Sequence, residues 1–193
     1  MSERVFVWVA HPRAGSFSAA LADAYQQAAQ AAGAEVRRMD LSEMEFSSEF
    51  RGYGDAPALE PSLQQWQANL AWADRVLIVH PLWWGAMPTL AKSVLDRALT
   101  PGFAYKYKAR GMAWDKLLEG KTGDAIITAD TPTWVDTWLY NKPARRTIKQ
   151  AVYQFCGIRP RFIRQLGSVK LSDAAARDKW LGLATQMGAK AAA

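Results

Sequence analysis

Short apolar runs recur along the chain, each followed by a segment with helical spacing, and this alternation constrains the fold most. The first run, residues 4–10, reads Arg-Val-Phe-Val-Trp-Val-Ala and is rich in β-branched and aromatic side chains. Such near-continuous apolar runs are typical of parallel strands covered on both faces. Further strands are predicted at 36–41, 75–80, 121–128 and 161–169.

Helical patterns fill the intervals between these strands. They cover 19–32, a segment opening at Pro61, 89–99 and 144–156, and a last helix has Ser172 as its expected N-cap. A strand-helix repeat of this kind implies a parallel sheet with right-handed crossovers. We therefore predict an α/β chain in one domain, residues 1–193. Its flavodoxin-like doubly wound five-stranded parallel sheet would have the order 2-1-3-4-5, with helices on both faces.

Length and composition narrow the class of protein. The 193 residues are half apolar, and no apolar run approaches the roughly 20 residues needed to span a bilayer. Without a recognisable signal peptide, a soluble cytoplasmic protein with no membrane insertion is expected. The single cysteine, Cys156, excludes an intramolecular disulfide, and we predict a buried thiol and no metal site.

The net charge of +6 comes from scattered basic residues, densest at Lys142, Arg145, Arg146 and Lys149. Two interpretations stay open for this group: a solvated helix face, or a patch that attracts a phosphorylated cofactor. Nucleic acid is not expected as a partner, since the sequence has no helix-turn-helix, zinc finger or aromatic RNA-binding motif.

The loops after the first, third and fourth strands should meet at the carboxyl edge of the sheet, where doubly wound proteins bind ligands. In the first loop, His11 to Ser18, hydroxyls and basic groups precede a helix N-terminus, an arrangement that favours a phosphate. Simple helix capping by one serine is the alternative. The candidate residues here are His11, Arg13, Ser16 and Ser18.

The loop after the third strand, Pro81 to Pro88, holds the adjacent tryptophans Trp83 and Trp84 between prolines and a glycine. This pattern favours a rigid platform for a planar ring, although burial of both tryptophans in the core is the alternative. The loop from Thr128 to Trp134 would hold the polar edge of the same ring. Its candidate residues are Thr128, Asp130 and Thr131.

Taken together, these loops resemble those of the NAD(P)H:quinone oxidoreductase family, and the resemblance extends over nearly the whole chain. It rests on the following motifs: Ala10-His-Pro12, Ser16-Phe-Ser18, Ala73-Asp74, Pro81-Leu-Trp-Trp-Gly-Ala-Met-Pro88 with Lys92, Asp96-Arg97, Gly102-Phe-Ala-Tyr-Lys-Tyr107 and Phe155-Cys-Gly157. The resemblance implies a flavin-dependent enzyme that carries hydride from NADH or NADPH to a quinone or similar small acceptor.

The resemblance also implies roles for individual residues. The flavin phosphate would be held by His11, Ser16, Phe17 and Ser18. The isoalloxazine would be lined by Pro81, Leu82, Trp83, Trp84 and Gly85. Gln67 matches a position that touches the adenosine half of FAD, which favours FAD over FMN. Tyr105 and Tyr107 match substrate-binding tyrosines that reach the site from the partner subunit of a homodimer.

The chain departs from the family in the loop after the fourth strand. That loop usually reads Thr-Thr-Gly-Gly and is followed by a tyrosine and a histidine that assist hydride transfer, whereas here no histidine follows His80. Catalytic residues therefore stay unassigned, with Tyr140 as a candidate. An electron carrier of the flavodoxin type and a regulatory flavoprotein of a membrane transporter are the alternatives. The donor, NADH or NADPH, and the physiological acceptor stay open.

Residues 100–114 give a separate reason to expect a dimer. They contain Phe103, Tyr105, Tyr107 and Trp114 with little regular structure to bury them, and exposed aromatic clusters usually mark interfaces. A loop folded back on its own sheet is the alternative.

Overall fold

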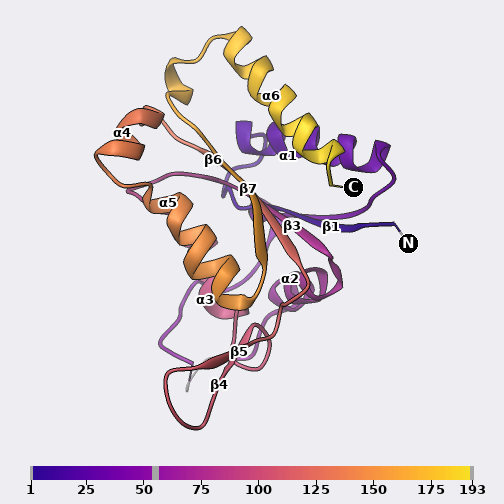
Figure 1. The fold of residues 1–193 in the computed structure, drawn as a ribbon, viewed down its shortest axis with the longest axis vertical. Helices are drawn as coiled ribbons and strands as arrows, with labels where there is room; N and C mark the ends of the chain where they lie inside the picture. The colour runs from indigo at the N-terminus through magenta and orange to yellow at the C-terminus, as the bar shows by residue number, and fades with distance from the viewer. Residues whose placement is uncertain (1, 54–56, 192–193) are drawn as a thin grey trace.

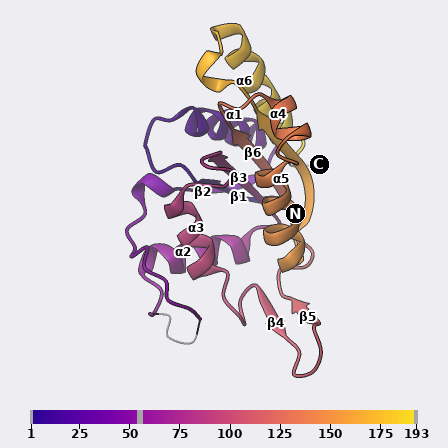
Figure 2. The ribbon, with the colours of Figure 1, turned by 90° about the vertical axis from the view of Figure 1, so that its left-hand side faces the viewer.

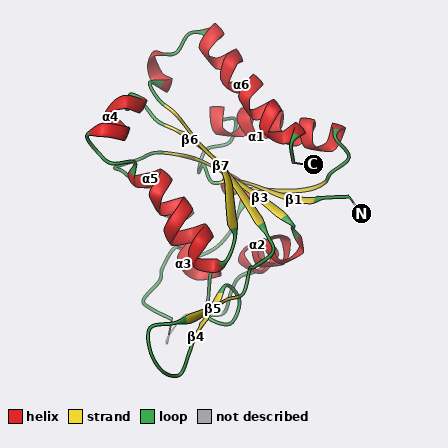
Figure 3. Ribbon diagram, in the orientation of Figure 1, coloured by secondary structure: helices red, strands yellow, loops and turns green. Residues whose placement is uncertain are grey.

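In the computed structural model, which describes residues 2–53 and 57–191, one parallel sheet forms the centre of the molecule (Figures 1 and 3). Its order is β2-β1-β3-β6-β7, which is 2-1-3-4-5 when only these five strands are numbered. The predicted fold is confirmed. The strands are β1 (Arg4–Val9), β2 (Glu35–Asp40), β3 (Arg75–Pro81), β6 (Thr122–Thr128) and β7 (Arg159–Leu166).

Alternate side chains of the strands enter two separate cores, one on each face of the sheet. From β1, Phe6 and Trp8 enter one core, and Val5, Val7 and Val9 enter the other. Figure 2 shows the resulting layers, with α1 and α6 on one side of the sheet and α2 and α3 on the other. The helices are α1 (Phe17–Ala31), α2 (Pro61–Trp72), α3 (Thr89–Ala98), α4 (Thr133–Trp138), α5 (Pro143–Arg146), the π-helical η2 (Thr147–Gln154) and α6 (Ala174–Ala189).

A buried carboxylate, that of Asp124 on β6, connects both helical layers to the sheet. It accepts a 2.8 Å hydrogen bond from the Tyr25 hydroxyl of α1 and a 3.1 Å bond from the Phe162 amide of β7. From the opposite layer, the Tyr153 hydroxyl of η2 donates to the Asp124 carbonyl at 2.6 Å. The register of β6 against β7 is irregular between Gly123 and Ala125, which frees the Asp124 backbone for this bond.

Three local predictions differ from the structure. Residues 100–114, expected to have little regular structure, contribute β4 (Tyr105–Tyr107) and the start of β5 (Trp114–Lys116) to a hairpin. The loop expected from Thr128 to Trp134 gives way at Thr133 to the short helix α4. A buried ion pair from Asp136 of α4 to Arg145 stabilises that helix, a tertiary contact that local sequence does not reveal. Asp173, not Ser172, caps α6, and its carboxylate accepts from the Ala176 amide.

Short 3₁₀ turns complete the fold: η1 (Leu41–Glu43) follows β2, and η3 (Val169–Leu171) follows β7. Strand β7 ends at Leu166 because Ser168 adopts a left-handed backbone (φ 57°) that turns the chain. Across residues 2–53 and 57–191, none of the helices has the length and apolar character that a bilayer crossing requires.

Helices α1 and α6 pack closely enough to require glycine at one position. A Cβ at Gly188 would lie 2.1 Å from the Tyr25 carbonyl oxygen, whereas a Cβ at Gly182 of the same helix meets nothing within 4 Å. Gly188→Ala should therefore lower the free energy of unfolding by about 1–3 kcal/mol through overpacking. Gly182→Ala should raise it by up to about 1 kcal/mol through helix propensity. Urea titration of both variants checks the opposite signs, and equal effects would contradict this packing.

Candidate functional site

The loops after β1, β3 and β6 leave the same edge of the sheet and enclose a cavity of about 290 Å³. This is the edge at which doubly wound sheets bind ligands. Most of the predicted cofactor residues line it. The lining consists of His11, Arg13, Phe17, Ser18, Pro81, Leu82, Trp83, Thr128, Ala129, Asp130, Thr131 and Val169.

The β1 loop supplies the groups suited to an anion. Helix α1 begins at Phe17, so the first N–H groups of the helix have no intrahelical acceptor and point toward the loop. Ser16 does not line the cavity; it is the N-cap, and its hydroxyl accepts from the Ala19 amide at 3.3 Å. The hydroxyl of Ser18 lies 3.4 Å from that of Thr128, which joins the β1 and β6 loops.

His11 stands beside this helix N-terminus as a neutral side chain. Its Nδ1 accepts a 3.0 Å hydrogen bond from the Arg13 amide, and its ring packs edge-on against Trp83 with centroids 5.7 Å apart. Burial, followed by the positive charge of Arg13, lowers the pKa of His11. The one full positive charge of the β1 loop at neutral pH is therefore the exposed guanidinium of Arg13.

The β3 loop folds into a tight turn that presents Trp84 to solvent. Trp83 and Ala86 exchange backbone hydrogen bonds of 2.8 and 3.0 Å, and the two residues between them, Trp84 and Gly85, both have positive φ. A left-handed backbone costs a non-glycine residue about 1–2 kcal/mol, and such strain is concentrated at functional sites. Trp84 is fully exposed and Trp83 is 46% exposed. The interpretation of these tryptophans as core residues is therefore wrong.

The β6 loop closes the third side of the cavity. The Asp130 carboxylate accepts a 2.8 Å hydrogen bond from the Lys170 amide, so the loop is joined to η3. Gly167 allows a close backbone approach, since a Cβ there would lie 2.7 Å from the Thr131 carbonyl oxygen. These contacts bring Val169 into the cavity wall. Sequence patterns did not identify Val169 or Ala129, because both contribute only apolar surface.

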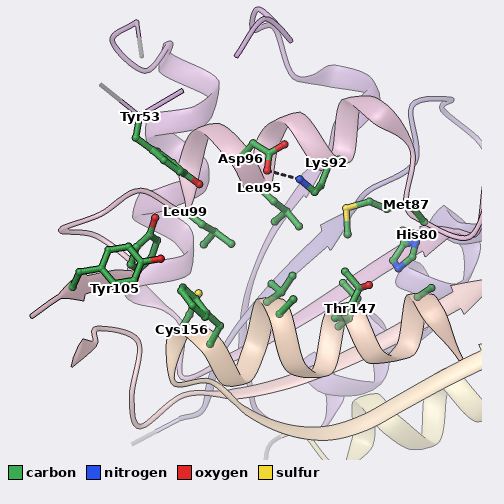
Figure 4. A pocket seen from close by; sticks show the side chains of 17 residues that line it. Tyr53, His80, Met87, Lys92, Leu95, Asp96, Leu99, Tyr105, Thr147 and Cys156 are labelled. Carbon is green, nitrogen blue, oxygen red and sulfur yellow. Dashed lines mark hydrogen bonds and ion pairs between the residues drawn. The ribbon is translucent and has the colours of Figure 1, made fainter. Parts of the chain in front are cut away.

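A second cavity, of about 400 Å³, lies between α3 and η2 and shares no lining residue with the first. Figure 4 shows its two ends: His80, Met87 and Thr147 lie at one, and Tyr53, Tyr105 and Cys156 at the other. The walls are mainly apolar, with the ion pair of Lys92 and Asp96 on the α3 side. The predicted burial of Cys156 is confirmed, and burial raises the pKa of its thiol to about 11.

His80 lines this second cavity and was not identified as a site residue from the sequence. Its Nδ1 lies 2.8 Å from the Pro81 carbonyl oxygen, which fixes the proton on Nδ1, and its Nε2 is buried without a hydrogen-bond partner. Complete burial lowers the pKa of His80 to about 4. The ring therefore offers a neutral acceptor at the cavity wall.

Other predicted site residues lie away from the first cavity. Gln67 donates from Nε2 to the Ala98 carbonyl oxygen at 2.6 Å, within the packing of α2 against α3. Tyr105 is buried against Phe155, with ring centroids 5.0 Å apart, and Tyr107 is 61% exposed. The β4–β5 hairpin that carries both tyrosines lies at the end of the molecule opposite α4 (Figure 1).

Part of the 100–114 segment therefore folds back on its own chain. The Trp114 ring stacks on Phe155 at 4.7 Å, and its indole N–H donates to the Phe155 carbonyl at 2.8 Å. The expectation that these aromatics are exposed is wrong for Tyr105, which is buried, and for Phe103 and Trp114, which are partly buried against the core; it holds for Tyr107. Tyr140, the candidate catalytic residue, is 57% exposed after α4 and lines neither cavity.

The sheet, the helix N-terminus and the aromatic turn define a doubly wound α/β protein with a ligand cavity at the carboxyl edge of its sheet. A family model described as "Flavodoxin-like fold" matches residues 3–182. The chain belongs to this family. The resemblance to the NAD(P)H:quinone oxidoreductases is confirmed, and with it the prediction of an oxidoreductase.

Two curated relatives illustrate this assignment. An uncharacterized NAD(P)H oxidoreductase of Haemophilus influenzae is 31% identical over 185 residues, which cover 92% of this chain and 90% of the relative. The quinone-reducing NAD(P)H dehydrogenase 1 of Rattus norvegicus is 29% identical over 126 residues, 54% of this chain and 46% of the relative.

Two solved structures share the fold along almost the full chain. The NAD(P)H:quinone oxidoreductase of Methanothermobacter marburgensis superposes with a TM-score of 0.81 at 22% identity and covers 98% of each chain. An FMN-dependent NADH-azoreductase of Bacillus anthracis, solved with FMN, has a TM-score of 0.76 at 16% identity and covers 99% of this chain and 100% of its own.

The buried imidazole of His80 should make folding pH-dependent. Because its folded pKa of about 4 lies below the ordinary value of 6.5, its contribution is complete above pH 6.5. It is lost as the pH falls toward 4, at a cost of up to about 3 kcal/mol. Urea titrations from pH 7 to 4 should show this loss, and His80→Gln should flatten it. His11, whose pKa is also lowered, remains as the internal reference; an unchanged slope in His80→Gln would contradict this assignment.

Proposed function

We propose that this chain binds a flavin at the carboxyl edge of the sheet and uses it to carry hydride from NAD(P)H to a quinone or similar small acceptor. The observation that carries the proposal is the combination of a helix N-terminus, a basic side chain and an aromatic turn around one cavity. A phosphate monoester on a planar ring system is the ligand that this combination suits.

The β1 loop fits the flavin phosphate. The free N–H groups at Phe17 and Ser18, the dipole of α1 and the charge of Arg13 all favour an anion. The neutral imidazole of His11 and the hydroxyl of Ser18 would add hydrogen bonds. Asp130 is the one carboxylate in the lining, and it stands on the opposite loop, held by Lys170.

The β3 and β6 loops have side chains suited to the planar isoalloxazine ring of a flavin. Trp83, Pro81 and Leu82 would lie along its apolar part, while Asp130 and Thr131 would face its polar edge. When bound, the flavin would supply the redox chemistry, accepting a hydride from NAD(P)H and passing two electrons to the acceptor. The protein would orient the ring, exclude water and leave one ring face open to both substrates. The quinone product would gain two electrons and two protons, one of them from solvent.

The choice between FMN and FAD is open. The preference for FAD rested on Gln67, whose amide is engaged with Ala98 and which does not line the cavity. The structure therefore gives that preference no support. Denaturing a fresh preparation and separating the released flavin by chromatography identifies it.

An electron carrier of the flavodoxin type is the competing function. The second cavity favours the enzyme, since its roughly 400 Å³ of apolar space between α3 and η2 offers room for an organic substrate. Stopped-flow mixing with NAD(P)H and then with a soluble quinone separates the two. The proposal expects bleaching and recovery of the flavin band, and a flavin reduced only by a protein partner would contradict it.

Arg13 provides a test of the phosphate site. Arg13→Glu should weaken FMN binding about tenfold or more, because a charge-assisted contact is replaced by repulsion. It should leave binding of riboflavin, which has no phosphate, nearly unchanged. Fluorescence titration of both ligands measures this difference, with Lys179→Glu on the exposed face of α6 as the charge-matched control. Failure of the wild-type chain to bind FMN or FAD at micromolar concentration would contradict the whole proposal.

We also propose that two chains form a dimer around two shared sites. Within one chain, the exposed ring of Tyr107 lines the second cavity, between α3 and η2, and does not line the first. A two-fold partner would cover this cavity and bring its own Tyr107 to the opposite chain's site.

Tyr107→Ala should raise the KM for quinone severalfold without changing flavin content, because the ring does not line the first cavity. Steady-state kinetics and the flavin-to-protein absorbance ratio measure these quantities. Sedimentation velocity supplies the control for assembly. A wild-type monomer with full quinone turnover would contradict the shared site.

A further inference from the structure

A basic groove of about 510 Å³ lies between the helix α5–η2 and strand β7. Both of its walls carry cations, four from the helix side and two from the strand. Its lining consists of Asn141, Lys142, Arg145, Arg146, Lys149, Gln150, Pro160, Arg161, Phe162, Ile163 and Arg164.

The number of basic side chains in this groove equals the net charge of the whole protein. The lining holds six of the 24 basic side chains and none of the 18 acidic ones, so the rest of the chain has equal numbers of each. Six cations in one concavity, of which only Arg145 is paired with a carboxylate, focus the positive potential there, whereas evenly scattered charges would not.

Most of these cations lack a protein counter-ion. Arg145 pairs with the buried Asp136 at 2.6 Å, and in the described part of the chain the other five basic side chains of the groove form no ion pair. Among the strands of residues 2–53 and 57–191, β7 pairs only with β6, so its outer edge is also unpaired. Several unpaired cations in a concave site are the arrangement that binds a multiply charged anion.

A chain of shared residues connects the basic groove to the apolar cavity between α3 and η2. A hollow of about 330 Å³ lies between them. It shares Asn141, Arg146 and Gln150 with the basic groove, and Thr147 and Ala151 with the apolar cavity. The three hollows therefore adjoin one another along the helix α5–η2, as an elongated ligand with an apolar planar end and an anionic end would require.

We infer that the basic groove binds the phosphate-bearing adenosine end of the nicotinamide dinucleotide and selects NADPH over NADH. This inference rests on the proposed function and specifies its donor. The two dinucleotides differ by one phosphate monoester, which carries a charge of about −1.5 to −2 at neutral pH. Arg146 and Arg161 offer planar donor pairs that match a phosphate in two contacts.

The shape of the groove argues against a nucleic-acid chain. Its only aromatic side chain, Phe162, lies under the Arg161 guanidinium, 5.3 Å from the ring centroid. Binding of single strands usually depends on open aromatic faces on which successive bases stack. A compact organic phosphate can be bound by cationic side chains without such stacking.

Binding of adenosine phosphates to the purified protein tests the groove without turnover. Calorimetry should show that 2′,5′-ADP binds at least about tenfold more tightly than 5′-AMP, a difference of about 1.4 kcal/mol. The double variant Arg146→Glu/Lys149→Glu should abolish this difference, since both side chains are exposed and their loss spares the core. Lys179→Glu, on the exposed face of α6, is the charge-matched control and should bind like wild type.

Kinetics supply the second measurement. The ratio of kcat/KM for NADPH to that for NADH should fall about tenfold or more in the double variant, with kcat for NADH retained. Equal binding of 2′,5′-ADP and 5′-AMP by wild type, or a ratio that the substitutions leave unchanged, would overturn the inference while hydride transfer continued. Groove-dependent binding of a single-stranded oligonucleotide in place of 2′,5′-ADP would overturn it as well. Tight 2′,5′-ADP binding without flavin reduction would support the groove and contradict the proposed function.

Discussion

The buried carboxylate of Asp124 is the contact on which the arrangement of the layers depends. A carboxylate without solvent costs several kcal/mol unless hydrogen bonds satisfy it, and here the Tyr25 hydroxyl and the Phe162 amide do so. Burial nevertheless raises the pKa of Asp124. Because its donors come from α1 and β7, and Tyr153 of η2 bonds its carbonyl, one residue sets how both layers sit on β6. The cavity at the carboxyl edge of the sheet takes part of its wall from α1 and β6, and the basic groove takes its walls from α5–η2 and β7.

The rigid sheet allows its loops to hold unfavourable conformations. Trp84 is both strained and fully exposed, and neither property stabilises a folded chain in water. The tight turn with Ala86 and the pairing of Leu82 to Thr128 through a 2.7 Å backbone bond keep it in place. His80 of β3, four residues before Trp84, is buried with an unsatisfied ring nitrogen. The strained backbone of Trp84 and the unsatisfied nitrogen of His80 both lower the stability of the fold, and both lie at the edge of the sheet where ligands bind. Such features are typical of binding sites.

The sheet could be predicted from sequence because its strands are buried on both faces, and the β-branched run of β1 records that burial directly. The cavity at the carboxyl edge of the sheet could be predicted too, since the carboxyl ends of parallel strands converge. Residues whose role depends on distant partners could not be predicted. Helix α4 depends on the ion pair of Asp136 with Arg145, and Gln67 has its amide engaged by Ala98, 31 residues further along the chain. Trp114 is likewise partly buried by Phe155, which follows η2 and lies 41 residues further along the chain.

The same limit explains why the basic residues had two open interpretations. Lys142 to Lys149 form a cationic helix face that is indistinguishable in sequence from a solvated surface. In the structure, Arg161 and Arg164 of β7 line the same groove as that face, so cations from two separate elements gather in one concavity. Like charges in proximity destabilise a folded chain by mutual repulsion. An anion bound in the groove would offset that repulsion. A helix face that is only solvated would not be stabilised by further cations from a neighbouring strand. The presence of Arg161 and Arg164 in the lining therefore favours the interpretation of the groove as an anion site over that of a solvated helix face.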